Sequence, residues 1–257
     1  VYVWAGPPYL SWSAPIDIAN DSADYPPSAH MDSEGHIYVA YTQQTGLDLV
    51  ELKMTFSQGI WTVGSVNTIC SAGDNYFPSI IKDPNGDLWV SWTYYDAVTE
   101  RYYIHSKTSQ DDGSTWGTGP SDPGTCLTNG TGSCYSQLLF QSPYVRCFYS
   151  DDSTLLAFRS HHIQSSGWDP QENIYSGSAI DDNFCAGLSA DNKVGIVFPG
   201  TSSILYKEFD GNSWSGVFTV DTCVPESASV RFLKDTPYAF FAKNVGGGQN
   251  QLFYSCK

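Results

Sequence analysis

The chain has 257 residues, of which 27 are acidic and only 12 are lysine or arginine, so its formal net charge is −15 at pH 7. Such a chain lacks the basic face that nucleic-acid phosphates require, and an anionic membrane surface is disfavoured for the same reason. No apolar run approaches the ~20 residues of a membrane helix. Aromatic residues make up 15% of the chain, and we expect a single all-β domain over residues 1–257, with many short strands and turns.

The N-terminal region divides into an extension, residues 1–9, and a strand-like segment, residues 10–19, that carries Trp12. Further tryptophans recur roughly every 50 residues, a period typical of propeller blades. Each of them follows a turn signal and has a Gly or Ser close by: Trp12, Trp61, Trp116, Trp168 and Trp214.

Strand-like runs of β-branched and aromatic residues recur with about the same spacing as these tryptophans. In chain order they are residues 37–41, 88–92, 144–148, 194–198 and 238–242, and several follow a hairpin turn signal such as Asp83-Pro84-Asn85-Gly86. A third strand follows within the unit, as in residues 102–105, 203–206 and 251–254. The pattern predicts blades of four antiparallel strands, with a tryptophan on the fourth.

The last unit contains only three predicted strands, whereas residues 10–19 form a fourth strand without a unit of their own. Pairing this segment with the last unit would close the ring and remove an open sheet edge. We therefore expect a five-bladed β-propeller closed by its N-terminal strand.

One turn carries a family resemblance. Ser109-Gln110-Asp111-Asp112-Gly113-Ser114-Thr115-Trp116 matches the Asp-box pattern S-x-D-x-G-x-T-W, and Phe209-Asp210-Gly211-Asn212-Ser213-Trp214 is a degenerate copy. The chain thus resembles the sialidase-like (Asp-box, or BNR-repeat) propellers. In that family the Asp-box is a structural turn on the face opposite the active site, so the resemblance implies a fold and not an activity.

Four of the five units carry an acid just before their first strand: Asp24, Asp74, Asp182 and Glu226. If the units are related by propeller symmetry, these carboxylates ring one mouth of the central channel. Carboxylates that converge repel one another unless a cation or proton intervenes, and an oxygen-rich site suits Ca²⁺. Ordinary solvated loop acids are the alternative.

The same four acids are the candidates if the protein is an enzyme, because inverting glycosidases need an acid and a base about 6.5–9.5 Å apart. Sialidase-like enzymes also use three arginines to hold a carboxylate. The chain has only Arg101, Arg146, Arg159 and Arg231 and lacks the Arg-Ile-Pro motif. No catalytic residues are assigned, and the sequence favours a protein without enzymatic activity.

Seven cysteines and two glycosylation sequons, at Asn20 and Asn129, point to a secreted or cell-surface protein. No CxxC pair suggests a zinc site. We expect Cys126 to pair with Cys134 across a short polar loop, and Cys223 to pair with Cys256. No cofactor follows from the sequence apart from the Ca²⁺ just considered.

Three functions remain open. A non-enzymatic extracellular module that recognises a glycan or a protein surface ranks first, because loops repeat, aromatic residues abound and catalytic motifs are absent. A self-assembling surface or filament subunit, associating through residues 1–9, ranks second. A glycoside hydrolase that uses the acidic ring ranks third.

Overall fold

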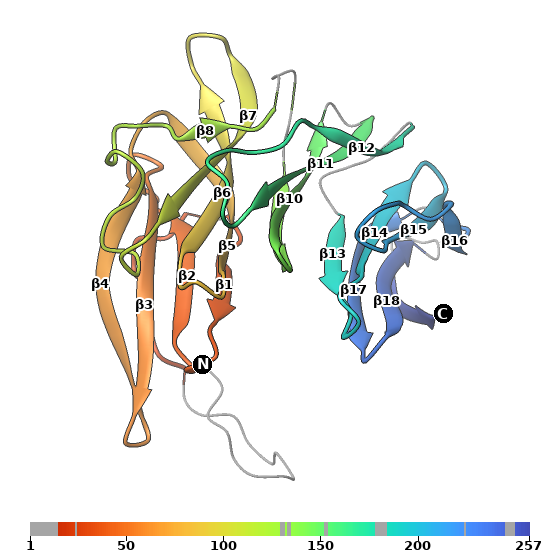
Figure 1. Ribbon diagram of the computed structural model, residues 1–257, viewed down its shortest axis with the longest axis horizontal. Helices are drawn as coiled ribbons and strands as arrows, with labels where there is room; N and C mark the ends of the chain where they lie inside the picture. The colour runs from red at the N-terminus through yellow and green to blue at the C-terminus, as the bar shows by residue number, and fades with distance from the viewer. Residues whose placement is uncertain are drawn as a thin grey trace.

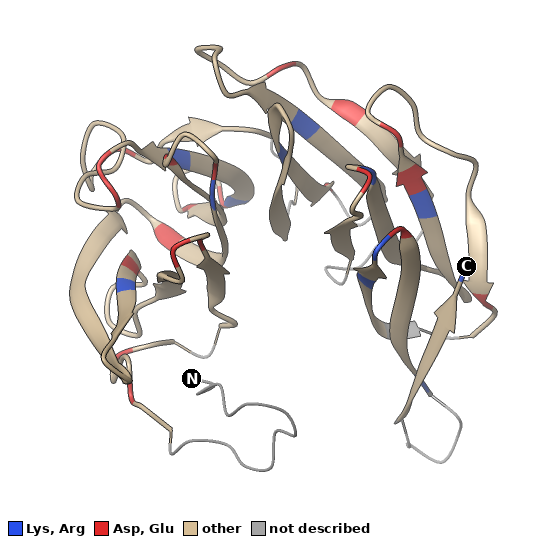
Figure 2. Cartoon of the chain, turned by 60° about the horizontal axis from the view of Figure 1, so that its bottom comes forward, with Lys and Arg blue, Asp and Glu red and all other residues tan. Residues whose placement is uncertain are grey.

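The computed structural model describes residues 15–23, 25–128, 132, 135–151, 154–177, 184–223, 225–244 and 250–257. These residues contain nineteen strands and no helix, and in this part of the chain no helix is long and apolar enough to span a membrane. The strands form five antiparallel sheets that follow one another in chain order, four of them with four strands and the last with three. Figure 1 shows the sheets arranged side by side, and the view in Figure 2 shows that together they form an arc.

The first two sheets and their strands are as follows. Sheet 1 contains β1 (Ser28–Met31), β2 (Ile37–Thr42), β3 (Leu49–Ser57) and β4 (Ile60–Cys70). Sheet 2 contains β5 (Asp74–Lys82), β6 (Leu88–Asp96), β7 (Arg101–Ser109) and β8 (Thr125–Cys126).

The other three sheets repeat this order. Sheet 3 contains β9 (Ser136–Gln141), β10 (Tyr144–Asp151), β11 (Leu155–His162) and β12 (Glu172–Ser176). Sheet 4 contains β13 (Cys185–Leu188), β14 (Val194–Gly200), β15 (Ser203–Phe209) and β16 (Phe218–Asp221). Sheet 5 contains β17 (Pro225–Leu233), β18 (Thr236–Asn244) and β19 (Asn250–Cys256). The predicted second and third strands are thereby confirmed, because each lies within β2, β6, β10, β14, β18, β7, β15 or β19.

The core consists of separate apolar layers between consecutive sheets. Trp116 lies in the layer between sheets 1 and 2, Trp168 packs on the layer between sheets 2 and 3, and Trp214 packs on the layer between sheets 3 and 4. Each of these tryptophans follows the third strand of its own sheet. The tryptophan spacing that predicts the repeat therefore reflects packing: one indole each from sheets 2, 3 and 4 covers the contact with the sheet before it.

Side-chain hydrogen bonds join the inner strands of neighbouring sheets. The Oγ of Ser28 accepts from the backbone N–H of Ile80 at 3.1 Å, and the Oγ of Ser79 accepts from that of Leu138 at 2.9 Å. One step further along the arc, the side-chain amide of Gln137 exchanges two hydrogen bonds with the backbone of Ala186. A polar side chain at the same place in three successive units thus binds the next sheet, which fixes how adjacent sheets align.

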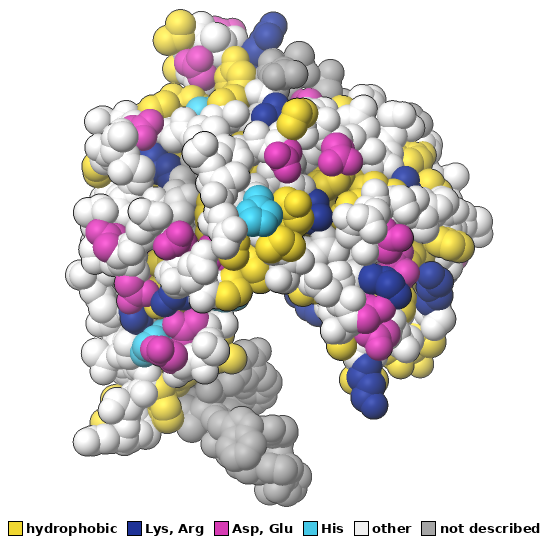
Figure 3. Space-filling view, in the orientation of Figure 1, with side chains coloured by type: hydrophobic (Ala, Val, Ile, Leu, Met, Phe, Trp, Pro, Cys, Tyr) yellow, Lys and Arg dark blue, Asp and Glu magenta, His cyan; other side chains and the backbone are white. Residues whose placement is uncertain are grey.

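The closing strand is not confirmed. Residues 15–19 are outside any strand, and Ile18 and Ala19 pack against the apolar cluster of sheet 1. Pro15 helps to explain this, because proline cannot donate a hydrogen bond to a ladder. Residues 1–9 and 10–14, including Trp12, lie outside the described residues. The space-filling view shows a notch between the two ends of the arc (Figure 3).

The structure does not show the predicted pairing of Cys223 with Cys256, since both are free thiols. Cys256 pairs in register with Tyr238 in sheet 5, and Cys223 follows β16 of sheet 4. The Cys126–Cys134 pairing cannot be assessed, because Cys134 lies outside the described residues.

Candidate functional site

A cavity of ≈370 Å³ lies on the axis of the arc, and all five inner strands contribute to its wall. Its size falls within the range of small-molecule sites. Residues before and along β1 and β5 line one side, and β9, β13 and β17 line the other. Its wall includes His30, Phe77, Tyr135, Cys185 and Arg231.

Polar and apolar groups both contribute to this wall. Burial lowers the pKa of His30, so its imidazole is neutral at physiological pH, although Asp32 opposes the effect and Lys82 adds to it. Burial also raises the pKa of the Tyr135 phenol. The guanidinium of Arg231 donates to the carbonyl of Val230 at 2.7 Å and lies 3.4 Å from the thiol sulfur of Cys185.

An aromatic cluster lies at one end of the cavity. The ring of Tyr25 is 4.8 Å from that of Tyr76 and 5.3 Å from that of Phe77, with edge-to-face geometry in both pairs. Tyr102 lies 6.2 Å from Tyr76 and 4.9 Å from Tyr95. Tyr102 is 40% exposed, so the cluster presents aromatic surface to solvent beside the cavity. We call these five residues the mouth cluster.

Local strain in β5 places Phe77 in this cluster. The register of β5 against β6 shifts between Tyr76 and Ser79, as in a β-bulge, and Phe77 has φ = 48°. The left-handed region is unfavourable for a bulky aromatic residue, and such residues occur most often at functional sites. The bulge lets Phe77 line the cavity while it contacts Tyr25.

The carboxylate of Asp74 lies beside the mouth cluster. Asp74 pairs with Tyr95 across the β5–β6 ladder, and its carboxylate accepts a hydrogen bond from the hydroxyl of Tyr76 at 3.2 Å. Burial raises the pKa of Tyr76, and the negative charge of Asp74 raises it further. The carboxylate is half-buried, so it combines access to solvent with a fixed orientation.

Of the four predicted ring acids, Asp74 is the one whose side chain the structure describes. Asp24 and Asp182 lie outside the described residues, and for Glu226 only the backbone, in β17, is described. Their convergence therefore remains a prediction, as does the Ca²⁺ site. Among the other predicted sites, Asn20 is exposed, and Asn129 lies outside the described residues.

The Asp-box turn lies away from this mouth and is tied to sheet 1. Asp112 accepts hydrogen bonds from Lys53, at 2.5 Å, Lys82, at 2.8 Å, and the hydroxyl of Tyr38, at 2.5 Å. These partners hold the pKa of Asp112 well below its usual range despite the opposing effect of burial. These contacts fasten the Asp-box turn to sheet 1.

A three-residue group near this turn offers metal-ligating atoms. Asp32, Glu34 and His36 each offer one such atom, and these atoms lie within 4.8 Å of one another. The Asp32 carboxylate already contacts the ammonium of Lys82 at 3.3 Å. Because the Asp32 carboxylate is already paired with Lys82, we do not assign a metal ion to this group.

The four arginines do not form a common site. Arg146 is 5% exposed and contacts Gln141 inside sheet 3, and Arg159 is half-buried on β11 of the same sheet. Arg231 lines the axial cavity, and Arg101 is exposed on the β6–β7 hairpin.

Sequence reasoning found part of the mouth cluster. It singled out the segments around Asp24 and Asp74, which include Tyr25, for their acids, but it did not identify Tyr95 or Tyr102. A signal was present, because tyrosine pairs at 94–95 and 102–103 flank one turn, and residues at matching distances from a hairpin turn become cross-strand neighbours.

Comparison with known proteins supports the fold. No protein-family model matches the chain, and no curated protein matches it. Solved structures do match. A protein of unknown function from Dyadobacter fermentans has a TM-score of 0.64 at 13% identity, over 90% of this chain and 75% of that one.

Two carbohydrate-active enzymes are also similar. The α-L-arabinanase of Penicillium chrysogenum, complexed with arabinobiose, has a TM-score of 0.59 at 14% identity, over 90% of this chain and 83% of that one. The Trypanosoma rangeli sialidase has a TM-score of 0.58 at 14% identity, over 89% of this chain but only 44% of that one. At such identities the likeness establishes a sialidase-like β fold and nothing about activity.

Proposed function

We propose that the protein binds a neutral glycan at the mouth cluster, above the axial cavity, and that its five sheets are the blades of one propeller. The observation that carries this proposal is the grouping of five aromatic side chains with the half-buried carboxylate of Asp74 at one end of a cavity that every inner strand lines.

The chemistry of sugars fits this surface. A sugar ring has a face of C–H groups that packs on the negative face of an aromatic ring, and hydroxyl groups that need polar partners. Tyr102 supplies accessible ring surface, and Asp74 supplies acceptors. The net charge of −15 opposes a polyanionic glycan and is compatible with a neutral one.

Glycan-array binding followed by calorimetry tests the proposal. Arabinobiose is included as a probe because it is bound in a similar solved structure. We expect Tyr102→Ala and Tyr76→Ala each to weaken binding about tenfold, which corresponds to about 1.4 kcal/mol. Tyr144→Ala, on sheet 3 and outside the mouth cluster, is the control and should bind like the wild type. Equal affinity in all four proteins would refute the proposal.

Glycoside hydrolysis is a second candidate, supported by the position of Asp74 and by the enzymes among the similar structures. Hydrolysis by two carboxylates requires a partner for Asp74, and the other predicted ring acids are the candidates. Release of sugar from an arabinan that disappears in Asp74→Asn while binding persists would establish an enzyme. Binding without release in the wild type would establish a recognition module.

A further inference from the structure

A groove lies between sheets 2 and 3, at the end of the sheets that carries the Asp-box turn. It consists of two adjoining cavities, of ≈440 Å³ and ≈330 Å³, which share Trp89, Thr108, Gly117 and His161. Trp89 lies near the start of β6, whereas Tyr95 of the mouth cluster lies near its end. Six residues of strand span about 20 Å, so the groove is separate from the mouth cluster. We call this space the Asp-box groove.

Three aromatic rings from the two sheets line the Asp-box groove. The ring of His161 lies 4.6 Å from that of Trp89 and 5.5 Å from that of Trp168. The two indoles are 6.0 Å apart and nearly perpendicular. The indole N–H of Trp89 donates to the carboxylate of Asp83 at 3.0 Å, which fixes this ring. Trp168 is half-buried, so part of its ring surface is accessible to a ligand.

The imidazole of His161 is a polar group in an otherwise aromatic layer. His161 is 8% exposed, and its Nδ1 has no hydrogen-bond partner among the described residues. The corresponding residue of sheet 4 is Phe209, since His161 and Phe209 pair in register with Val145 and Val194, which pack toward the sheet before. Phe209 contacts the tryptophan of its sheet, Trp214, at 5.0 Å. An apolar ring therefore suffices for packing at this position, and a buried polar ring without a partner points to a ligand.

Carboxylates give the Asp-box groove a negative charge. Asp87 and Asp111 line the larger cavity, and Asp122 lines the smaller one. Asp111 is held in a fixed orientation, because its carboxylate accepts from the hydroxyl of Thr115 at 2.6 Å and from the backbone N–H of the same residue at 2.8 Å. Within the described part of the chain, no ion pair engages any of these three acids.

The cationic residues in the wall do not offset this charge. Lys107 is the one lysine or arginine among the described lining residues. Its ammonium is already engaged, because it donates to the carbonyls of Ile69, at 2.7 Å, and Gly119, at 2.8 Å. Burial lowers the pKa of His161, so its imidazole is neutral at physiological pH.

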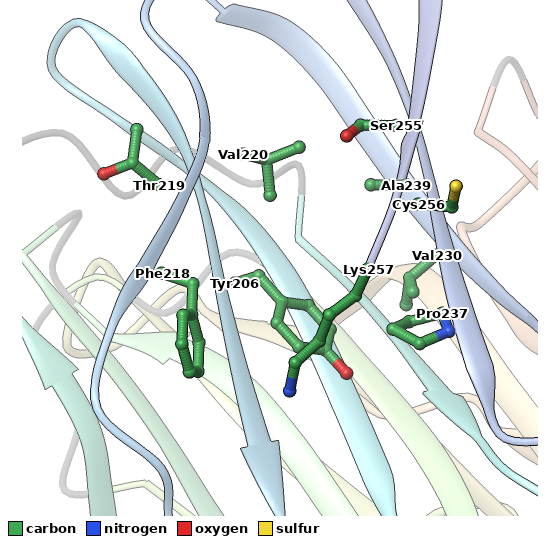
Figure 4. A pocket seen from close by; sticks show the side chains of 10 residues that line it. All are labelled: Tyr206, Phe218, Thr219, Val220, Val230, Pro237, Ala239, Ser255, Cys256 and Lys257. Atoms are coloured by element: carbon green, nitrogen blue, oxygen red, sulfur yellow. The ribbon is translucent and has the colours of Figure 1, made fainter.

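Other aromatic rings of the protein have a cation from the chain itself. The ammonium of Lys207 lies 5.8 Å from the centre of the Trp214 ring. Lys257 lies 4.8 Å from the centre of the Phe218 ring, at the border of a mainly apolar cavity between sheets 4 and 5 (Figure 4). Among the described residues, no lysine or arginine lies over the indoles of the Asp-box groove. These indoles and the nearby carboxylates thus lack the cation that the other sites have.

We propose that the Asp-box groove binds a primary ammonium group at the junction of its two cavities, against the rings of Trp89 and Trp168. The negative face of an indole attracts a cation more strongly than any other side-chain ring. The N–H groups of an ammonium form strong hydrogen bonds with carboxylates, which Asp87 and Asp122 supply on either side of the junction. The unprotonated nitrogen of the neutral His161 ring is a further acceptor. The ligand is therefore a free amine or the side chain of a lysine on another protein.

Binding of n-butylammonium and of its neutral analogue butan-1-ol, measured by NMR titration at pH 7, tests the proposal. We expect butan-1-ol to bind at least tenfold more weakly. Asp87→Asn and Trp168→Ala should each weaken binding of n-butylammonium about tenfold, as expected for loss of one charge-assisted or cation–aromatic contact. Glu172→Gln removes an exposed acid from β12 of the same sheet as Trp168 and is the matched control, with unchanged binding.

Equal affinity for n-butylammonium and butan-1-ol would overturn the proposal, as would wild-type binding in Asp87→Asn. Tyr102→Ala, in the mouth cluster, should bind n-butylammonium like the wild type, and a loss there would place the cation at the other site. Nα-acetyl-lysine methylamide distinguishes the two sources of the ammonium. Tighter binding of this compound than of n-butylammonium supports a lysine side chain, and weaker binding supports a free amine; no binding of either compound would refute the site.

Discussion

Glu51 gives the sharpest test of how burial controls the stability of this fold. Its side chain is fully buried on β3 beneath the Asp-box turn, Oε1 has no hydrogen-bond partner, and Oε2 receives a long bond of 3.4 Å from the amide of Asn67. Burial raises the pKa of Glu51 from 4.5 to about 7, and the negative charge of Asp112 adds to this effect while Lys53 opposes it. The folded protein therefore prefers the neutral carboxyl.

The sign of the pH effect follows from this preference. An acid with a raised pKa in the folded state favours folding fully below its unfolded value, here 4.5, and loses that contribution as the pH rises toward about 7. One pKa unit corresponds to about 1.4 kcal/mol, so the ionised Glu51 lowers the free energy of unfolding by about 3 kcal/mol above pH 7. Glu51→Gln keeps the shape of the side chain and cannot ionise.

Urea unfolding of the wild type and Glu51→Gln at pH 5 and pH 8 measures this effect. We expect the free energy of unfolding of Glu51→Gln, relative to that of the wild type, to be higher at pH 8 than at pH 5, by up to about 3 kcal/mol. Glu100→Gln, at the exposed end of the β6–β7 hairpin, is the control and should show no such gain. If the difference between Glu51→Gln and the wild type is the same at both pH values, the raised pKa is wrong.

Three further predictions concern the contacts between sheets. Ser79→Ala leaves the buried N–H of Leu138 without its acceptor and should cost about 1–3 kcal/mol in chemical denaturation; a smaller loss would mean that another acceptor replaces the hydroxyl. Asp112→Asn removes the charge shared by two lysines, and because Asp112 is partly exposed we expect a loss of about 1–2 kcal/mol that shrinks in high salt; a salt-independent loss would contradict an electrostatic origin. Hydrogen bonds from His36, Lys82 and Glu34 hold the pKa of Asp32 at about 2 against the effect of burial, so its contribution is present above pH 3.8 and lost as the pH falls to about 2. Acid titrations of Asp32→Asn should lack this part of the wild-type transition, and identical titrations would refute it.

The repeat was predictable because its cause is local. Each strand needs alternating or continuous apolar residues, and each hairpin needs a turn signal. Sheets 1 to 4 each have a tryptophan after their third strand, so the pattern around Trp116 and Trp214 can be read from the sequence alone. Contacts between chain segments are different. The bulge at Phe77 and the approach of Tyr25 to Tyr76 depend on how sheets align, which no short pattern encodes.

The disulfide prediction failed for the same reason. Cys223 and Cys256 are close to the start and end of one predicted unit, and sequence position suggested that they meet. The β18–β19 register instead places Cys256 beside Tyr238, and Cys223 follows β16 of the preceding sheet. Only the register decides which side chains are neighbours across a sheet.

The order of the sheets has a consequence for how the chain is made. Each apolar layer joins sheets that are consecutive in the sequence, so most contacts become available as soon as the next 40–50 residues or so leave the ribosome. Folding can then progress from sheet 1 to sheet 5 during synthesis without waiting for distant segments. Sheets 1 and 5 are the two ends of the arc, and among the described residues no apolar layer joins them, so folding of the described sheets needs only contacts between neighbours in the sequence.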